Sequence, residues 1–142
     1  MLFLNNSLQL TELEAPHYHE IIVHTAMVYL PHATSALVVG GGDGYTMTEL
    51  LKHKNLKHLL QVEIDQMVMD VSANFFPGIN ATYTNPRAKV FVQDVRTFLN
   101  TQVAMTDPPQ YDVRLVRASN DRNLDNDRNL AFFFHLPPGH HH

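Results

Sequence analysis

The sequence contains no cysteine among its 142 residues. This absence excludes disulfide bonds, thiolate metal ligands and a cysteine nucleophile, and because it fits a reducing compartment we expect a cytoplasmic protein. Positive charge is also scarce. The formal net charge is -4, and Lys and Arg are scattered rather than clustered, so nothing favours nucleic acid as a partner. Residues 1–10 lack the basic flank and apolar run of a signal peptide, and no apolar stretch is long enough to cross a membrane.

What the sequence does contain is the pattern of one α/β domain. Hydrophobic residues make up 44% of the chain, which supports one buried core. Short β-branched runs alternate with helical patterns, and this alternation predicts a parallel sheet with flanking helices and right-handed crossovers. We expect a β-hairpin at residues 2–11, helices at 16–30, 46–54, 66–76 and 95–99, and strands at 36–39, 59–63, 89–92 and 113–116.

Apolar residues at helical spacing indicate which helix faces are buried. Those sharing one face of the helix at 16–30 are Tyr18, Ile21, Ile22 and Tyr29. Those expected inward in the next two helices are Met47, Leu50 and Leu51, then Met67, Val68, Val71 and Phe75. After residue 116 the pattern fails, and we expect an irregular tail at residues 118–142, whose three terminal histidines are interpreted as a tag remnant.

The most informative segment is the run Leu-Val-Val-Gly-Gly-Gly-Asp-Gly at residues 37–44. It places a glycine-rich turn after a strand, and an acid, Glu63, closes the next strand about twenty residues later, as in nucleoside-binding α/β domains. The glycines let backbone approach a ligand, and Glu63 is placed to accept hydrogen bonds from ribose hydroxyls. The alternatives are that Asp43 caps the following helix and that Glu63 is a solvated strand end.

Asp43 distinguishes this turn from a phosphate-binding loop. A loop that binds phosphate or carboxylate avoids negative charge, so the end of the ligand that faces Asp43 is predicted to be cationic. The histidines do not predict a metal site, because His17 and His19 point to different faces of their helix.

Six short segments occur along the chain in a fixed order. They are Leu-Gln-Leu-Thr-Glu at 8–12, Tyr-His-Glu at 18–20, Gly-Gly-Gly-Asp-Gly at 40–44, Val-Glu-Ile-Asp at 62–65, Asn-Pro-Arg at 85–87 and Gln-Asp at 93–94. In this order, and at closely similar spacings, they resemble the spermidine synthase family of polyamine aminopropyltransferases. No single motif among them is specific, so the resemblance, which covers roughly residues 2 to 116, rests on the ordered set.

This resemblance implies a fold and an activity. The fold is a Rossmann-like domain of the class I methyltransferase type at residues 16–117, preceded by a remnant β-hairpin domain at 1–15 and followed by an incomplete C-terminal half. The activity is transfer of an aminopropyl group from decarboxylated S-adenosylmethionine, the co-substrate, to putrescine in polyamine biosynthesis, with no other cofactor. Family members are commonly dimers or tetramers, which implies a homo-oligomer.

The resemblance also assigns site residues. Asp43 would hold the ammonium of the decarboxylated donor and repel the carboxylate of ordinary S-adenosylmethionine. Asp94 would accept from adenine while also capping its helix, and Tyr18 is alternatively a core residue. The full donor-binding set is Gln9, Gly40, Gly41, Gly42, Asp43, Glu63, Asp94 and Val95. The acceptor-amine set is Tyr18, His19 and Asp43.

The sequence departs from the family where the catalytic base is expected. The family pattern Tyr-Asp-Val-x-x-x-Asp-Ser-x-Asp-Pro aligns with residues 111–121, which place Arg117 at the base position and Asn120 at the second acidic position. An arginine is no base at neutral pH, so no catalytic residue is assigned, and Arg117 is either a surface residue or a replacement of the base. The alternatives are an inactive nucleoside-binding relative that acts as a partner or regulatory subunit, and an S-adenosylmethionine-dependent methyltransferase, against which Asp43 argues.

Overall fold

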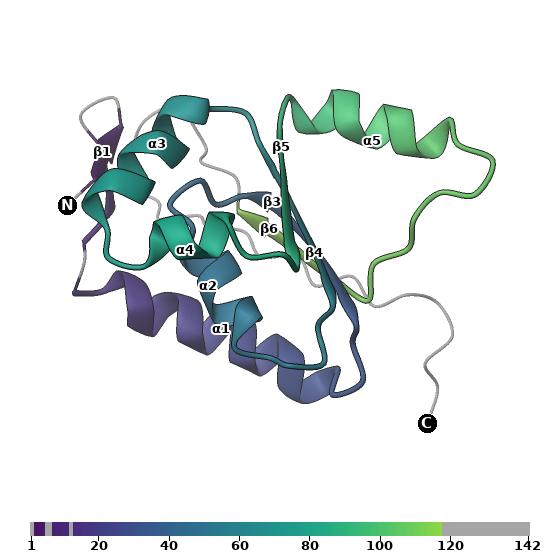
Figure 1. Cartoon of the computed structure of the whole chain (residues 1–142), viewed down its shortest axis with the longest axis horizontal. Coiled ribbons are helices and arrows are strands. Elements are labelled where there is room, and N and C mark those ends of the chain that lie inside the picture. Colours follow the sequence, from purple (N-terminus) through teal and green to yellow (C-terminus); the bar gives the residue numbers. More distant parts are fainter. Residues whose placement is uncertain (1, 5–6, 12, 118–142) are drawn as a thin grey trace.

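A four-stranded parallel sheet with helices on both faces forms the body of the protein (Figure 1). The computed structural model describes residues 2–4, 7–11 and 13–117, and for residues 2–4, 7–10 and 16 it describes the backbone alone. The irregular tail expected at 118–142 lies outside the described residues. None of the helices in the described ranges combines the length and apolar character that crossing a bilayer requires.

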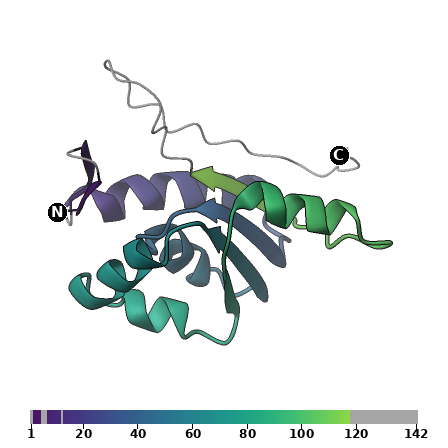
Figure 2. The same cartoon turned by 90° about the horizontal axis from the view of Figure 1, so that it is seen from above.

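The strand order of the sheet is β5-β4-β3-β6, and every neighbouring pair is parallel, as predicted. Because β6 pairs beside β3 rather than beside β5, it forms one edge of the sheet in the described residues (Figure 2). The strands are β3 (Ser35–Gly40), β4 (His58–Glu63), β5 (Ala88–Val92) and β6 (Val113–Arg117). A separate antiparallel hairpin, β1 (Leu2–Leu4) and β2 (Ser7–Leu10), confirms the predicted hairpin.

Helices α1 to α4 lie on one side of the sheet in Figure 1 and α5 lies on the other. This arrangement follows from right-handed crossovers, since the path reverses direction between β5 and β6. The helices are α1 (Ala15–Tyr29), α2 (Tyr45–Leu51), α3 (Gln66–Phe75), α4 (Ile79–Tyr83) and α5 (Val95–Val103). The prediction missed α4, which begins where Gly78 adopts a positive φ of 83° and lets the chain reverse.

The predicted buried face of α1 is wrong. Ile21 is 69% exposed and Tyr29 is 77% exposed. The buried residues of this helix are instead Ala15, His19, Val23, Ala26 and Met27. This face carries Val23, Ala26 and Met27 into the cluster that also holds residues of α2 and the sheet, while Ile21 and Tyr29 lie on the outside.

The predicted face of α3 is wrong in part. Met67 and Phe75 are exposed, while Met69 and Ser72 are buried. In α2 the prediction is confirmed for Met47 and Leu50, which are fully buried, and Leu51 packs partly buried against the same core. The apolar residues of α3 are spread around the helix, so periodicity alone did not identify the side that meets the sheet.

Two apolar cores sandwich the sheet because successive strand residues point to opposite faces. On the side of α1 and α2, Ala36 and Val38 belong to the larger cluster. On the side of α5, Leu37 packs with Val62 and Phe98. Both faces of the sheet are therefore packed against helices, and the loops at its carboxyl edge leave from well-packed strands.

Candidate functional site

The carboxyl ends of the four strands bring the predicted site residues to one edge of the sheet. Gly40 ends β3 opposite its register partner Arg117 at the end of β6, and Glu63 ends β4 opposite Val92 of β5. This edge is where open α/β sheets bind ligands. The strand order therefore arranges the site as a row, with Asp94 after β5 at one end and Arg117 at the other.

The glycine turn needs its glycines for its own conformation. Gly40, Gly41 and Gly44 have φ values of 76°, 75° and 79°, which residues other than glycine rarely adopt. At Gly42 a Cβ would lie 2.9 Å from Glu63 Oε2. The turn is closed by a hydrogen bond in which the Gly44 N–H donates to the Gly41 carbonyl at 2.9 Å. Glycine in this turn therefore follows from backbone strain and packing before any ligand is considered.

Two residues that the sequence analysis missed support the turn from beneath. The Gln61 side-chain amide donates to the carbonyls of Gly40 and Gly41 at 2.9 and 2.7 Å. The Tyr83 hydroxyl donates to the Gly42 carbonyl at 2.6 Å, and burial raises the pKa of Tyr83. The sequence marks Gln61 as unusual, because it is a polar residue inside an otherwise apolar stretch of β4. No comparable sequence feature marks Tyr83.

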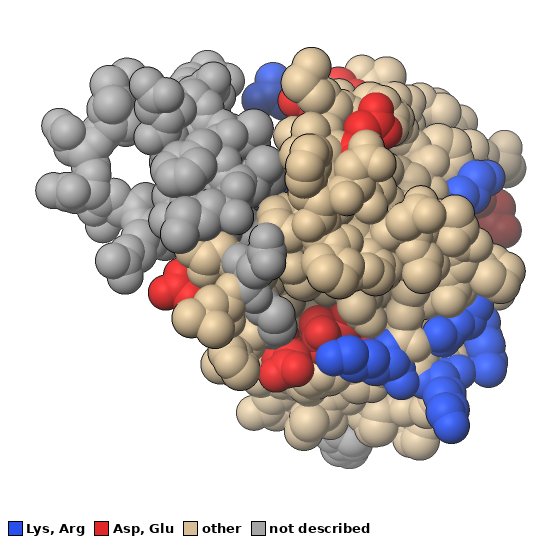
Figure 3. All heavy atoms as spheres, turned by 60° about the vertical axis from the view of Figure 1, so that its left-hand side comes forward, with Lys and Arg blue, Asp and Glu red and all other residues tan. Residues whose placement is uncertain are grey.

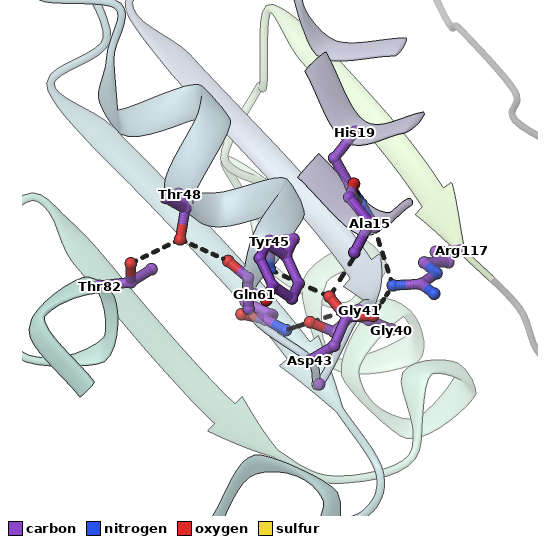
Figure 4. Close-up of polar contacts among 12 residues, drawn as sticks. Ala15, His19, Gly40, Gly41, Asp43, Tyr45, Thr48, Gln61, Thr82 and Arg117 are labelled. Carbon is purple, nitrogen blue, oxygen red and sulfur yellow. Dashed lines mark hydrogen bonds and ion pairs between the residues drawn. The ribbon is translucent and has the colours of Figure 1, made fainter. Parts of the chain in front are cut away.

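Asp43 is buried at the end of the turn, 4% exposed, and both carboxylate oxygens are engaged (Figure 4). Oδ1 accepts from the Tyr45 backbone N–H at 3.0 Å, and the N-cap residue of α2 is Gly44, so Asp43 lies one residue before the cap. Oδ2 forms an ion pair with the Arg117 guanidinium. Asp43 thus faces a cation that is part of the chain itself, and the N-cap of α2 is Gly44 rather than Asp43.

His19 joins the same cluster from α1. Its Nδ1 lies 2.6 Å from the Ala15 carbonyl, so Nδ1 carries the proton and Nε2 accepts from Arg117 Nη1 at 3.0 Å. Asp43 Oδ1 lies 3.9 Å from Nε2, beyond hydrogen-bond range. Burial lowers the pKa of His19 to about 4, and the Arg117 charge acts in the same direction, so the ring is neutral at neutral pH.

Aromatic rings flank this histidine. Tyr18 meets His19 edge to face with ring centroids 5.3 Å apart, and Tyr45 stacks on it at 5.7 Å. Burial raises the pKa of Tyr18, while the Arg117 charge acts in the opposite direction. The structure therefore places Tyr18 against His19, and His19 within 3.9 Å of Asp43.

Arg117 is not a surface residue, which removes one of its two interpretations. Its side chain is 12% exposed, and burial lowers its pKa to about 10, so it remains charged at neutral pH. Asp43 and His19 hold the guanidinium in place. A largely buried cation, held by Asp43 and His19, thus stands at the position where the family pattern has its base.

Glu63 faces the turn from the end of β4 and is not the solvated strand end of the alternative interpretation, since it is buried. Its Oε2 accepts from the Gly42 N–H at 2.8 Å, and its Oε1 accepts from the N–H groups of Ile64 and Asp65 at 2.8 and 3.1 Å. A carboxylate has about four acceptor positions, so these bonds leave one position for a hydroxyl donor.

Asp94 and Val95 lie on the Glu63 side of the row. Asp94 is exposed and caps α5 by accepting from the N–H groups of Arg96 and Thr97 at 2.9 and 3.1 Å. Val95 is the first residue of α5 and is partly buried. Asp94 is therefore the N-cap of α5, as the sequence predicts, and its side chain is exposed. Gln9 lies in β2, but its side chain is outside the described part of the structure.

No group of three histidine and acidic side chains within the described ranges could hold a metal ion. A hollow of about 220 Å³ lies on the α5 face near the start of β6, away from the glycine turn. It is lined by Leu37, Phe98, Val103, Pro109, Tyr111 and Arg114. The face drawn in Figure 3 carries small groups of charged side chains within a mainly uncharged surface, unlike the continuous basic surface of a nucleic-acid-binding domain.

Comparison with known proteins places these features in a family. A family model described as the spermine/spermidine synthase domain matches residues 15–133. A polyamine aminopropyltransferase of Alkaliphilus metalliredigens is 37% identical over 99 residues, which cover 70% of this chain and 35% of that protein. Spermidine synthase 1 of Datura stramonium is 39% identical over 99 residues, covering 70% and 32%.

A solved structure shows the same fold. A crystal structure of spermidine synthase in complex with the transition-state analogue AdoDATO superposes with a TM-score of 0.64 at 23% identity, covering 74% of this chain and 34% of that one. The present chain spans about a third of the length of the curated relatives it matches first. The shared part is the parallel sheet with its flanking helices.

Proposed function

The chain belongs to the spermine/spermidine synthase family, and from this premise we propose that its glycine turn holds the nucleoside of decarboxylated S-adenosylmethionine for aminopropyl transfer to putrescine. The observation that carries the proposal is Glu63, a buried acid that faces the Gly42 N–H across the turn and keeps one acceptor position. That geometry suits a nucleoside whose ribose lies against the carboxyl edge of the sheet.

The other residues of the row have complementary places in this proposal. Asp94 and Val95 lie on the Glu63 side, where the adenine would sit. Tyr18 and His19 lie on the opposite side, beside Asp43, where the amine end of the donor and the acceptor would meet. Gln9 is proposed to approach the same amine end from β2.

The reaction joins an amine nitrogen of putrescine to the propyl carbon next to sulfur. The C–N bond forms as the C–S bond breaks, and methylthioadenosine leaves with the bonding electrons. An alkyl ammonium has a pKa of about 10, so the attacking amine must first lose a proton to a base. In this chain Arg117 occupies the base position and is charged. What the chain's own residues support is binding and alignment of the nucleoside.

That charge favours a second candidate function, an inactive nucleoside-binding relative that acts as a partner or regulatory subunit. The specific observation is the Arg117–Asp43 ion pair, which places a cation where an incoming diamine would need a base. A turnover assay with decarboxylated S-adenosylmethionine and putrescine separates the two functions. Formation of spermidine above a no-protein blank would exclude the inactive relative.

Small-molecule substrates and a cytoplasmic place of action belong to the same proposal, as does a homo-oligomer. They are supported by the aminopropyltransferase relatives and by a sequence without cysteine, which fits a reducing compartment. Light scattering coupled to size-exclusion chromatography would measure the oligomeric state.

The nucleoside site is tested by calorimetric titration with methylthioadenosine, which carries the nucleoside without the aminopropyl group. We expect saturable binding by the wild type and at least about tenfold weaker binding by Glu63→Gln, which loses a charged acceptor. The matched control is Asp70→Asn, because Asp70 is an exposed acid on α3 that contacts Gln66. A folded wild-type protein that gives no saturable heat would overturn the proposal.

A further inference from the structure

Asp43 is the acid expected to face the ligand tail, and in this chain it is already paired with a cation. The Arg117 guanidinium pairs with Asp43 Oδ2, and the Tyr45 N–H occupies Oδ1 at 3.0 Å. An ammonium group entering the site would therefore meet a neutral ion pair instead of an open carboxylate. The attraction that a lone Asp43 would offer to a cationic tail is absent from this arrangement.

The position of Arg117 is built into the sheet. Its backbone is the register partner of Gly40, the first residue of the turn that carries Asp43. The pairing of β6 with β3 therefore determines where the guanidinium begins, and three residues of turn determine where the carboxylate lies. The two groups meet because of backbone geometry, so the contact does not depend on a mobile surface side chain.

His19 completes the placement of the guanidinium. Its Nδ1–H donates to the Ala15 carbonyl at 2.6 Å, which leaves Nε2 as an acceptor for Arg117 Nη1 at 3.0 Å. The histidine is thus a positioning residue for Arg117. It also supplies no positive charge that would compete with the arginine for Asp43.

Displacing Arg117 from Asp43 would be unfavourable. The Arg117 side chain is 12% exposed, and a largely buried charge that loses its partner is strongly destabilised. A cationic ligand would have to leave Arg117 unpaired or share Asp43 with it, and both arrangements place two cations close together. A ligand with a neutral tail neither displaces Arg117 nor brings a second cation close to it. A ligand whose tail carries a carboxylate would have the Arg117 guanidinium beside that carboxylate.

We propose that Arg117 determines ligand charge at this site, so that the chain binds adenine nucleosides with a neutral or carboxylate-bearing tail in preference to those with a purely cationic tail. The inference rests on the proposed nucleoside site and specifies which members of that ligand class it accepts. Methylthioadenosine has a neutral tail, decarboxylated S-adenosylmethionine has a cationic tail, and S-adenosylmethionine adds a carboxylate to the cationic one.

The test is calorimetric titration of the wild-type protein with these three ligands. We expect methylthioadenosine to bind at least as tightly as the decarboxylated donor, and S-adenosylmethionine to bind no more weakly than the donor. In Arg117→Gln, which frees Asp43, we expect the decarboxylated donor to bind about tenfold more tightly and methylthioadenosine to change by less than about threefold. The preference for S-adenosylmethionine over its decarboxylated form should then reverse.

The matched control is Arg114→Gln. This substitution removes the same charge from the same strand. Arg114 lines the hollow on the α5 face, away from Asp43. Its ligand preference should equal that of the wild type. If Arg117→Gln does not fold, the three wild-type titrations still decide.

The outcomes separate this inference from the proposed function. Wild-type protein that binds the decarboxylated donor about tenfold or more tightly than methylthioadenosine would overturn the inference and leave the nucleoside site intact. An equal shift in Arg114→Gln and Arg117→Gln would also overturn it, because net charge would then be the cause. Failure of all three ligands to bind folded protein would overturn the proposed function itself, and the inference with it.

Discussion

Gly40 and Arg117 are register partners across β3 and β6, and a Cβ on Gly40 would overlap the Arg117 carbonyl oxygen. The glycine turn and the end of β6 are therefore one structural unit. The close approach of these two backbones is what allows the Arg117 side chain to reach Asp43.

This approach predicts that Gly40→Ala is severely destabilising. Gly78→Ala is the matched control, because Gly78 has a similar positive φ of 83° but nothing within 4 Å of its Cβ position. We expect Gly78→Ala to lower the free energy of unfolding by about 1 kcal/mol through backbone strain alone. Gly40→Ala should lower it by about 3 kcal/mol or more, because the backbones must separate. Urea unfolding measures both, and equal losses would contradict the close approach.

The buried His19 predicts how stability depends on pH. Its folded pKa of about 4 lies below its ordinary value of 6.5, so the unfolded chain binds more protons between these pH values. Stability is therefore fully present above pH 6.5 and is lost as pH falls toward 4, by about 3 kcal/mol for this group alone. His19→Gln should lose that part of the pH dependence. Urea unfolding from pH 7 to 4 compares the two proteins, and identical pH profiles would contradict the assignment.

The hydrogen bonds from Gln61 to the turn are expected to stabilise the fold. Replacing it with leucine keeps the size of the side chain but leaves the carbonyls of Gly40 and Gly41 without their donor. We expect Gln61→Leu to lower the free energy of unfolding by about 2 kcal/mol or more, because buried acceptors lose their hydrogen bonds. Gln66→Leu, at an exposed position on α3, should change it by less than about 0.5 kcal/mol. A loss in Gln61→Leu no larger than in this control would show that the two bonds are not stabilising.

Arg87 predicts a structural role for the Asn-Pro-Arg segment that contributed to the family resemblance. Its guanidinium donates to the carbonyls of Leu51, His53 and Leu56, which form the end of α2 and the loop after it. Arg87→Met should lower the free energy of unfolding by about 2–3 kcal/mol, since hydrogen bonds from a charged donor are lost. Arg87→Lys should be intermediate, because one ammonium lacks the planar spread of the guanidinium.

The exposed Arg96 on α5 is the control for this pair, and Arg96→Met should leave the unfolding midpoint within the error of the measurement. If Arg87→Met and Arg96→Met unfold at the same urea concentration, the three carbonyl contacts do not stabilise the fold.

The order of strands and helices could be predicted because its signals are local. Runs such as Leu37 to Val39 followed by glycines predict a strand and a turn without reference to the rest of the chain. The buried faces of α1 and α3 could not be predicted in the same way. Ile21 and Tyr29 are apolar yet exposed, and which side of a helix meets the sheet depends on packing against elements distant in sequence.

In the candidate site, too, features set by neighbouring residues could be predicted, and features set by distant contacts could not. That Glu63 ends a strand and Asp94 caps a helix followed from neighbouring residues, and both placements agree with the structure. Gln61 and Tyr83 were missed because supporting a turn from below requires knowing which strands and helices lie beneath it. Hydrogen bonds across such distances along the chain leave no periodic trace.

By itself the sequence determined the strand–turn–helix order, the acid inside the glycine turn and the arginine in place of the expected base, since each depends on residue identity and spacing alone. Only the tertiary structure decided what Asp43 and Arg117 do to each other. Pairing of β6 with β3 brings two residues far apart in the chain into contact, so the carboxylate of Asp43 is paired with the guanidinium of Arg117. The charge of this site is therefore a property of the strand order, which local sequence does not encode.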